Sequence, residues 1–550
     1  MRTINEFDEH IVTIVREGKF VAGREIVDDL CTRFQVSPPH ARKLIQRVAD
    51  KGLIRSSRPA TFGKGQFIYF TPERSLDIAS IRPICEKYRP PLARVLDALV
   101  VNEGILSYYE ALKICSSPLE DSSSKNSMLN GLILMLDQLK LIVMKTDDRS
   151  VRYLIDSGMP EVLHTTVMDD HYSKMVLDCV FLPDILKWLR KVNVIDNLKT
   201  MYRNKLSPSK GTAHNNLPWD AYGYTKTTGI NPTLGAKADV IEKQTLVVLD
   251  VVVHRPYEQY DVDGFLGRVQ INLNSVKRGT RKVLPIVFYN DISDQALNTL
   301  RALGFLSFNI DAIFGTRIHE ILDNVGNAQK GIFAKDSNET EKRVAKSLKA
   351  IRAAGQEENL SNLKGTLFEY LFYPVFKLVY PDAMIFQGQT LSEKLPGGGK
   401  EKYEYDYIIQ SSNPKEIVVV ELKGYSSEAR IPVGDTNTQN TLNWFFGKTL
   451  QFAKRQYAKE LEAGFKLRAC YITSAGFWDD GKKFLEGQKK YAPRKLSTHY
   501  DGDGLLTFLE ENGFSHIKKT VERYFINKEE RVKAAPQPPT AEAVTAFDIF

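Results

Sequence analysis

The chain has 550 residues, an apolar fraction of 43% and a formal net charge of +8, values that predict several domains with real cores and favour an anionic partner. Its five cysteines are scattered with no Cys-x-x-Cys pair, so we expect neither a zinc site nor a disulfide framework. Because no apolar run reaches membrane-spanning length and the amino terminus is polar, we expect a cytoplasmic protein with no membrane partner.

Residues 1–75 are predicted to form three helices and two short strands. Apolar residues recur at helical spacing in the first two segments, and Ser37 and Pro38 mark the start of the third helix. A glycine-rich loop then separates the strand-like segments LIRSS and FIYF. This order of elements resembles a winged helix-turn-helix domain.

The same region carries a stripe of positive charge. From Arg33 to Lys64 there are eight Lys or Arg residues and one acidic residue, Asp50. Such a stripe is the footprint expected for binding to a phosphate backbone. The alternative is a solvated face on a protein-protein module. We predict that this domain binds DNA through Lys43, Arg47, Lys51, Arg55, Arg58 and Lys64.

Residues 80–158 repeat this order with a weaker positive charge, and we expect a second winged-helix-like module with a structural or dimerising role. Residues 160–215 are predicted to form a helical connector. Residues 216–320 alternate strand-like and helix-like segments, which indicates an α/β domain. Residues 321–362 are predicted to be a charged helical arm, either solvated or bridging two domains. The Pro- and Ala-rich residues 526–550 are expected to be a flexible tail.

Residues 363–525 contain the stretch with the clearest chemistry. Two strand-like runs within 403–423 are joined by a Ser-Ser-Asn-Pro turn, which predicts a β-hairpin. Because side chains alternate along a strand, Glu421 and Lys423 share one face, and Asp406 reaches the same edge from the first strand. An apolar helix before the hairpin carries a lone acid, Glu369. Carboxylates bind hard divalent cations, and a nearby lysine can assist a metal-bound water in attacking phosphorus.

These residues resemble the PD-(D/E)xK (restriction-endonuclease-like) nucleases, over roughly Leu363 to Gly476. The resemblance implies that Asp406 and Glu421 bind Mg²⁺, for which Mn²⁺ can substitute. It implies Lys423 as the water-activating base or charge stabiliser, and Glu369 as a helix-borne acid near the metal. No Pro precedes Asp406, and Gln451 and Tyr457 do not have the spacing of a QxxxY motif, so the branch of the superfamily stays open. The alternative is a solvated hairpin with a surface ion pair.

Two further features bear on the nuclease hypothesis. The helix after the hairpin offers Lys448, which we expect to contact DNA phosphate unless it is simply a solvated charge. The α/β domain at 216–320 looks like a degenerate duplicate of the predicted nuclease domain. Asp239 lies eleven positions before Asp250, so two acids are present, while Val252 stands at the position that corresponds to Lys423. An ordinary α/β fold with an accidental spacing is the alternative.

We therefore expect a multi-domain α/β protein with two N-terminal winged-helix modules, a middle α/β domain that is a candidate degenerate nuclease, and a C-terminal PD-(D/E)xK domain. The predicted function is a metal-dependent DNA endonuclease targeted by the winged helices, in restriction or anti-phage defence. The alternatives are a nuclease subunit of a larger transposition or repair assembly, and a DNA-binding regulator with a silent nuclease fold. Besides DNA, the expected partner is a second copy or another protein, bound through the middle domain.

Overall fold

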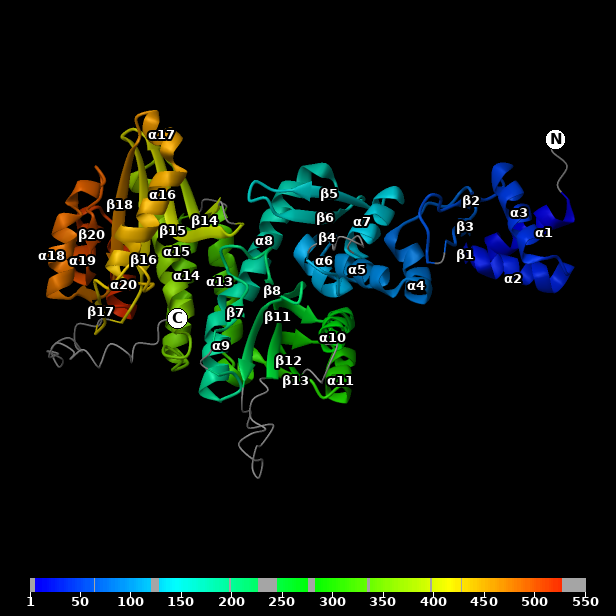
Figure 1. The fold of residues 1–550 in the computed structure, drawn as a ribbon, viewed down its shortest axis with the longest axis horizontal. Coiled ribbons are helices and arrows are strands. Elements are labelled where there is room, and N and C mark those ends of the chain that lie inside the picture. Colours follow the sequence, from blue (N-terminus) through cyan, green and yellow to red (C-terminus); the bar gives the residue numbers. More distant parts are fainter. Residues whose placement is uncertain are drawn as a thin grey trace, which may run out of the picture.

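The computed structural model describes residues 5–63, 65–119, 128–196, 199–225, 245–275, 282–333, 337–395, 398–426 and 428–526. Lys64, Asp239 and nearly all of the predicted tail lie outside these ranges. The chain is a multi-domain α/β protein, drawn out along one axis with its first helices at one end and its last strands at the other (Figure 1). None of the helices in the described ranges combines the length and apolar character needed to cross a membrane.

The first module is built from three helices and three short strands. These are α1(Glu6–Gly18), β1(Phe20–Ala22), α2(Gly23–Phe34), α3(Pro38–Asp50), β2(Arg55–Ser56) and β3(Ile68–Phe70). The antiparallel sheet has the order β1-β3-β2. The predicted inward face of α3 is buried, which confirms the helical spacing read from the sequence: Ala41, Leu44, Ile45 and Val48.

The second module repeats this order after an additional helix. Its elements are α4(Ile78–Tyr88), α5(Pro90–Val101), β4(Ile105–Ser107), α6(Tyr108–Cys115), α7(Met128–Gln138), β5(Ile142–Thr146) and β6(Arg152–Asp156), and its antiparallel sheet has the order β4-β6-β5. Ser107 caps α6 and forms a reciprocal pair with Glu110. Helix α6 packs against the next unit, so the module is part of a larger body.

The predicted connector is helical only in its first part. It forms η1(Glu161–Leu163), α8(His164–Val180) and α9(Leu182–Lys191), and then the strands β7(Met201–Tyr202) and β8(Thr212–His214). Strand β7 pairs with the middle sheet, and β8 pairs with β9(Leu217–Trp219). The prediction of a helical connector over 160–215 was therefore wrong beyond residue 191. Strands of two or three residues are too short to show a period of their own, and tertiary pairing makes them strands.

The middle unit is a five-stranded mixed sheet with helices on its faces. It comprises β10(Ala221–Thr225), β11(Thr245–Tyr257), α10(Gln259–Asn274), β12(Val283–Ile292), α11(Asp294–Ala302), β13(Leu306–Asn309) and α12(Ile310–Phe314). The strand order is β13-β12-β11-β10-β7. Strands β7, β10 and β11 run antiparallel in succession, and β11, β12 and β13 run parallel. Strand β11 therefore belongs to both parts of the sheet, because it pairs antiparallel with β10 and parallel with β12.

Two helices follow, α13(Ile318–Phe333) and α14(Ser337–Ala353), and they pack against each other. They occupy most of the predicted charged arm. The arm is not a solvated helix, because Val344, Leu348 and Ile351 are buried in a core that includes residues of the middle unit and of the following unit. Its charged residues lie on the outward faces, which explains why the sequence looks hydrophilic overall.

The carboxy-terminal unit is a second five-stranded mixed sheet. Its central elements are α15(Ser361–Val379), β14(Met384–Lys394), β15(Lys400–Ser412), β16(Lys415–Lys423), η3(Trp444–Thr449), α16(Leu450–Gln456), β18(Lys466–Thr473) and β20(His499–Tyr500). Around them lie β17(Arg430–Ile431), α17(Ala458–Glu462), β19(Gly476–Phe477), α18(Asp479–Gly487), η4(Lys489–Tyr491), α19(Gly502–Glu511) and α20(Ser515–Tyr524). The sheet order is β14-β15-β16-β18-β20. The predicted hairpin is present as β15 and β16.

The directions of these strands repeat those of the middle unit. Strands β14, β15 and β16 run antiparallel in succession, and β16, β18 and β20 run parallel. Helix α15 packs beneath the sheet, and its first turn is capped from the connector. There, Asp184 of α9 accepts hydrogen bonds from the backbone N–H groups of Asn362 (3.1 Å) and Leu363 (3.0 Å). The two α/β units therefore share a core, and the connector between them caps the first helix of the second unit.

Candidate active site

The end of strand β16 brings an acid and a base together. Lys423 Nζ lies 2.6 Å from Glu421 Oε1, and both side chains are largely buried. On the neighbouring strand, Asp406 accepts a hydrogen bond from the backbone N–H of Leu422 at 2.7 Å through Oδ2. Tyr407 is in register with Val420, which sets Asp406 opposite Glu421. The predicted convergence of two carboxylates and an ammonium group is present at this edge of the sheet.

Glu369 approaches the same edge from helix α15. The hydroxyl of Tyr407 on β15 donates to the backbone carbonyl of Glu369 at 3.0 Å, which fixes this turn of the helix against the sheet. Burial raises the pKa of Glu369 to about 7; Lys205 opposes this rise, and Asp406 adds to it. Asp406 raises the pKa of Glu369 because the negative charges of two neighbouring carboxylates repel each other. All four residues predicted for catalysis therefore lie around one site.

The charges at this site influence each other strongly. Burial raises the pKa of Glu421 to about 7, with Lys423 opposing the rise and Asp406 adding to it. Burial alone would lower the pKa of Lys423, but Glu421 and Asp406 raise it well above the ordinary value of a lysine. Lys423 is therefore a stable cation here, and the carboxylates would gain from any further positive charge.

A fifth charged residue enters the site from outside the carboxy-terminal unit. Lys205 follows β7 of the middle sheet, and its Nζ lies 2.9 and 2.8 Å from the two carboxylate oxygens of Glu369 and 2.7 Å from Thr366 Oγ1. Sequence reasoning did not find Lys205. It stands in a short polar segment without periodicity, 164 residues before its partner, and no local signal distinguishes it from other lysines.

The neighbours of Lys205 hold this segment against the carboxy-terminal sheet. Asn204 Nδ2 donates to Glu404 Oε2 at 2.7 Å. Leu206 lies over Gly388 of β14, where a Cβ would come within 2.4 Å of the leucine Cδ2. Gly388 also has a positive φ of 63°, so glycine is required here both for its backbone conformation and for the approach of Leu206.

The residues present fit a divalent cation with oxygen ligands. Among the described residues, no group of three or more His, Cys, Asp or Glu side chains is arranged to hold a metal ion. Asp406 and Glu421 nevertheless offer two carboxylates on facing positions of adjacent strands, and Mg²⁺ is commonly held by one or two carboxylates together with substrate phosphate and water. The donor set contains no thiolate or imidazole, which favours Mg²⁺ or Mn²⁺ over zinc.

The middle unit has a matching pair of acids. Ala221 is in register with Leu249, which sets Asp220 opposite Asp250, and Asp220 Oδ2 accepts from the backbone N–H of Val251 at 2.8 Å. This repeats the contact between Asp406 and the N–H of Leu422. Asp220 therefore occupies the position for which the sequence suggested Asp239, which lies outside the described residues. Val252 takes the position of Lys423, as predicted.

Cationic side chains surround this second pair of acids. Lys113 of α6 lies 2.5 Å from Asp220 Oδ2 and 2.7 Å from Asp250 Oδ1. Arg203 lies 3.2 Å from Asp220, and Arg268 lies 3.1 Å from Asp250. Lys113 has an exposed fraction of 8%, and the two aspartates have 0% and 1%. Burial opposes the ionisation of Asp250, but Arg268 and Lys113 lower its pKa. These acids are already neutralised and closed to substrate.

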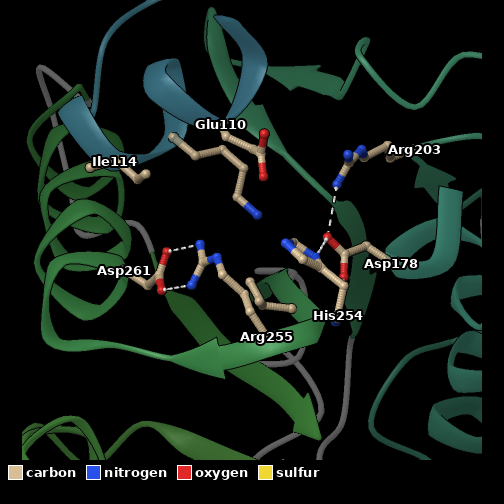
Figure 2. Close-up of a pocket in the computed structure, with 9 residues that line it drawn as sticks. Glu110, Ile114, Asp178, Arg203, His254, Arg255 and Asp261 are labelled. Atoms are coloured by element: carbon tan, nitrogen blue, oxygen red, sulfur yellow. Dashed lines mark hydrogen bonds and ion pairs between the residues drawn. The ribbon is translucent and has the colours of Figure 1, made fainter. Parts of the chain in front are cut away.

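A small polar cavity adjoins these charges, between α6, α8 and strand β11 (Figure 2). Figure 2 shows Arg255 paired with Asp261, at 2.6 and 2.9 Å, and His254 paired with Asp178 at 2.9 Å. Arg203 closes the cavity on the side of Asp178. The acids and bases around this cavity pair largely with each other.

The predicted DNA-binding residues of the first module fall into two groups. Lys43, Arg47, Arg55 and Arg58 are exposed. Lys51 is different, because it forms an ion pair with the buried Asp8 of α1 and has an exposed fraction of 29%. The positive charge of Lys51 is therefore neutralised within the module by Asp8. Lys448 lies on η3 and is half-buried, with its Nζ 4.5 Å from the centre of the Trp444 ring and 3.5 Å from Asn437 Oδ1.

No family model matches the chain, and no curated protein matches it. Among solved structures, one chain, described as the crystal structure of protein VC1899 from Vibrio cholerae, is similar over 48% of this chain and 81% of its own length. The sequence identity is 11% and the TM-score is 0.21. A TM-score of this size supports no inference about fold or activity, so function has to be inferred from the site itself.

Proposed function

We propose that the protein is a metal-dependent DNA endonuclease whose active site lies in the carboxy-terminal unit. The observation that carries the proposal is the convergence of Asp406, Glu421, Lys423 and Glu369 at one edge of a mixed sheet. The order of helix α15, antiparallel strands β14 to β16, a helical segment and the parallel strand β18 is that of a PD-(D/E)xK nuclease. We assign the unit to this superfamily on that basis.

In this proposal Asp406 and Glu421 hold Mg²⁺. The bound cation would act as a Lewis acid toward a phosphodiester oxygen and lower the pKa of an attacking water. Lys423 is held as a cation by Glu421, at 2.6 Å, and by Asp406. Lys423 would then stabilise negative charge on the phosphate in the transition state or assist the attacking water.

We further propose that the first module is a winged helix that holds the DNA. The exposed cations of α3, of β2 and of the loop after it support this role: Lys43, Arg47, Arg55 and Arg58. The first module and the carboxy-terminal unit lie at opposite ends of the long axis (Figure 1), so DNA held by α3 would be cut at a distance from the bound site. This layout suits an enzyme of restriction or anti-phage defence.

Removing charge from α3 is expected to weaken DNA binding and to flatten its salt dependence. The slope of log K against log salt should fall by about one for every phosphate that is no longer neutralised, so Lys43→Ala with Arg47→Ala should lower it by about two. The measurement is a salt titration of DNA affinity by fluorescence anisotropy. Lys342→Ala, an exposed lysine of α14, is the control and should leave the slope unchanged. A double variant with the wild-type slope would move the DNA contact away from α3.

The test of the proposed activity is incubation of the full chain with plasmid DNA and with linear DNA, with and without magnesium. We expect cutting that requires the cation, seen as nicked or linear plasmid. The competing function is a DNA-binding regulator with a silent nuclease fold, which the ion pairing of both Glu369 and Glu421 by lysines would suit. DNA binding without cutting in either magnesium or manganese would favour that function.

We also propose that the middle unit is a degenerate duplicate of the nuclease fold. The same succession of strand directions, and the same contact of an aspartate with a backbone N–H across the hairpin, support a common origin. With Val252 in place of the lysine, and with Lys113, Arg203 and Arg268 on the acids, this unit would be catalytically inert.

A further inference from the structure

Lys205 makes three close polar contacts within the candidate active site. An ammonium group has three N–H donors. Three acceptors surround Nζ, the two carboxylate oxygens of Glu369 at 2.8 and 2.9 Å and Thr366 Oγ1 at 2.7 Å. These contacts hold the ammonium group beside Glu369, so Lys205 is well suited to fix the position of that side chain.

The side chains that Lys205 contacts belong to one face of helix α15. Thr366 and Glu369 are three positions apart, so they lie side by side on the helix surface. The hydroxyl of Thr366 in turn donates to the carbonyl of Asn362 at 3.3 Å. With both carboxylate oxygens bound by one ammonium group, Glu369 is held in a single orientation beside Asp406, from which it would otherwise be repelled.

The segment that carries Lys205 is anchored at both of its sides. Arg203 is fully buried in the middle unit, where it lies 3.2 Å from Asp220 and where its Nε donates to the carbonyl of Pro208 at 2.5 Å. Asn204 and Leu206 contact the carboxy-terminal sheet. The position of the ammonium group is thus set by the junction of two units, and Lys205 has little freedom to leave Glu369.

We propose that Lys205 is a positioning residue of the nuclease site, which acts by orienting the Glu369 carboxylate and so completes the site from outside the carboxy-terminal unit. This inference rests on the proposed nuclease function. Mutating a residue that hydrogen-bonds a carboxylate of a metal site typically lowers activity or metal affinity by about 10- to 100-fold. The contribution of Lys205 should therefore appear in kcat, with little change in the KM for DNA.

A double-mutant cycle tests this role. Lys205→Met keeps the aliphatic stem and removes the charge, and Glu369→Gln removes the charge that Lys205 binds. Each single variant is expected to cut plasmid in magnesium about 10- to 100-fold more slowly than the wild type. If Lys205 acts through Glu369, the double variant should be no slower than the slower single variant. The double variant also has no unpaired charge at this position, so it is expected to fold even if Lys205→Met does not. Lys210→Met, at an exposed lysine of the same segment, is the matched control and should cut at the wild-type rate.

The outcomes separate this inference from the proposed activity. An active wild type with a fully active Lys205→Met variant would overturn the role of Lys205 alone, as would a double variant whose loss equals the product of the two single losses. A loss that appears only in KM, or that follows the folded fraction measured by circular dichroism, would also overturn it. A wild type that cuts no DNA in magnesium or manganese would overturn the nuclease proposal and this inference together.

Discussion

Replacing Lys423 with alanine is expected to lower the rate of DNA cutting in magnesium by several orders of magnitude. The ammonium group lies 2.6 Å from Glu421 and is held in its charged form by two carboxylates. In the proposed mechanism the ammonium group acts on the attacking water or on the negative charge that develops on phosphorus, so its loss would raise the energy of the transition state and leave the ground state nearly unchanged. Asp406→Ala and Glu421→Ala should be as severe, because each removes a proposed metal ligand worth several kcal/mol in the transition state.

The measurement is single-turnover cutting of plasmid, with DNA affinity determined in parallel. Affinity should persist in all three variants, because the proposed DNA contacts lie in the first module. Lys415→Ala is the matched control, since Lys415 is an exposed lysine at the opposite end of the same strand β16. A Lys423→Ala protein that cuts at the wild-type rate would remove the basis for placing catalysis at this edge of the sheet.

Replacing Lys113 with methionine is expected to lower the free energy of unfolding by about 3 to 5 kcal/mol, the usual effect of removing one partner from a buried ion pair. Lys113 contacts Asp220 and Asp250, and the exposed fractions of these three side chains are 8%, 0% and 1%. Burial alone would lower the pKa of Lys113, but the two aspartates raise it above the ordinary value of a lysine. Without the ammonium group, two aspartates remain close together with only Arg203 and Arg268 to balance them.

Urea denaturation followed by circular dichroism would measure this change. Lys145→Met is the control in the same module, because Lys145 forms an exposed ion pair with Glu161 at 2.8 Å, and such pairs contribute about 0 to 1 kcal/mol. The folded fraction of Lys113→Met should still cut DNA at the wild-type rate. A slow variant with an unchanged unfolding curve would mean that the acids of the middle unit take part in the reaction.

The sequence was sufficient to predict the central part of the candidate site. Alternation along a strand places Glu421 and Lys423 on one face, and a two-residue turn between β15 and β16 makes the position of Asp406 predictable from its distance along the chain. The same reasoning failed in the middle unit. There, a short hairpin turn like that between β15 and β16 was assumed, and this spacing pointed to Asp239 as the partner of Asp250. The paired strands are instead separated by residues 226–244, and their register identifies Asp220 as the partner.

Contacts between distant segments were beyond the reach of sequence patterns. Lys205 and Lys113 come from segments whose local sequence is ordinary, and only the packing of whole units brings them to their acids. Strand β7 was missed for a related reason, because two residues cannot display a period of two. The sequence places Lys51 within a continuous basic stripe, whereas in the structure it pairs with Asp8, which lies 43 residues away along the chain.

If the carboxy-terminal unit is a nuclease, as proposed, the segment from Met201 to Leu206 makes it unsuitable for transfer to another protein as an isolated domain. Fusing residues 361–526 to a foreign DNA-binding domain would transfer Asp406, Glu421, Lys423 and Glu369 but would leave Lys205 behind. The graft would also expose the apolar surface of α15 that α13 and α14 cover, and would lose the cap that Asp184 provides. On the proposed function, a new target preference would therefore have to come from replacing the first module alone, with everything that follows it kept as a single piece.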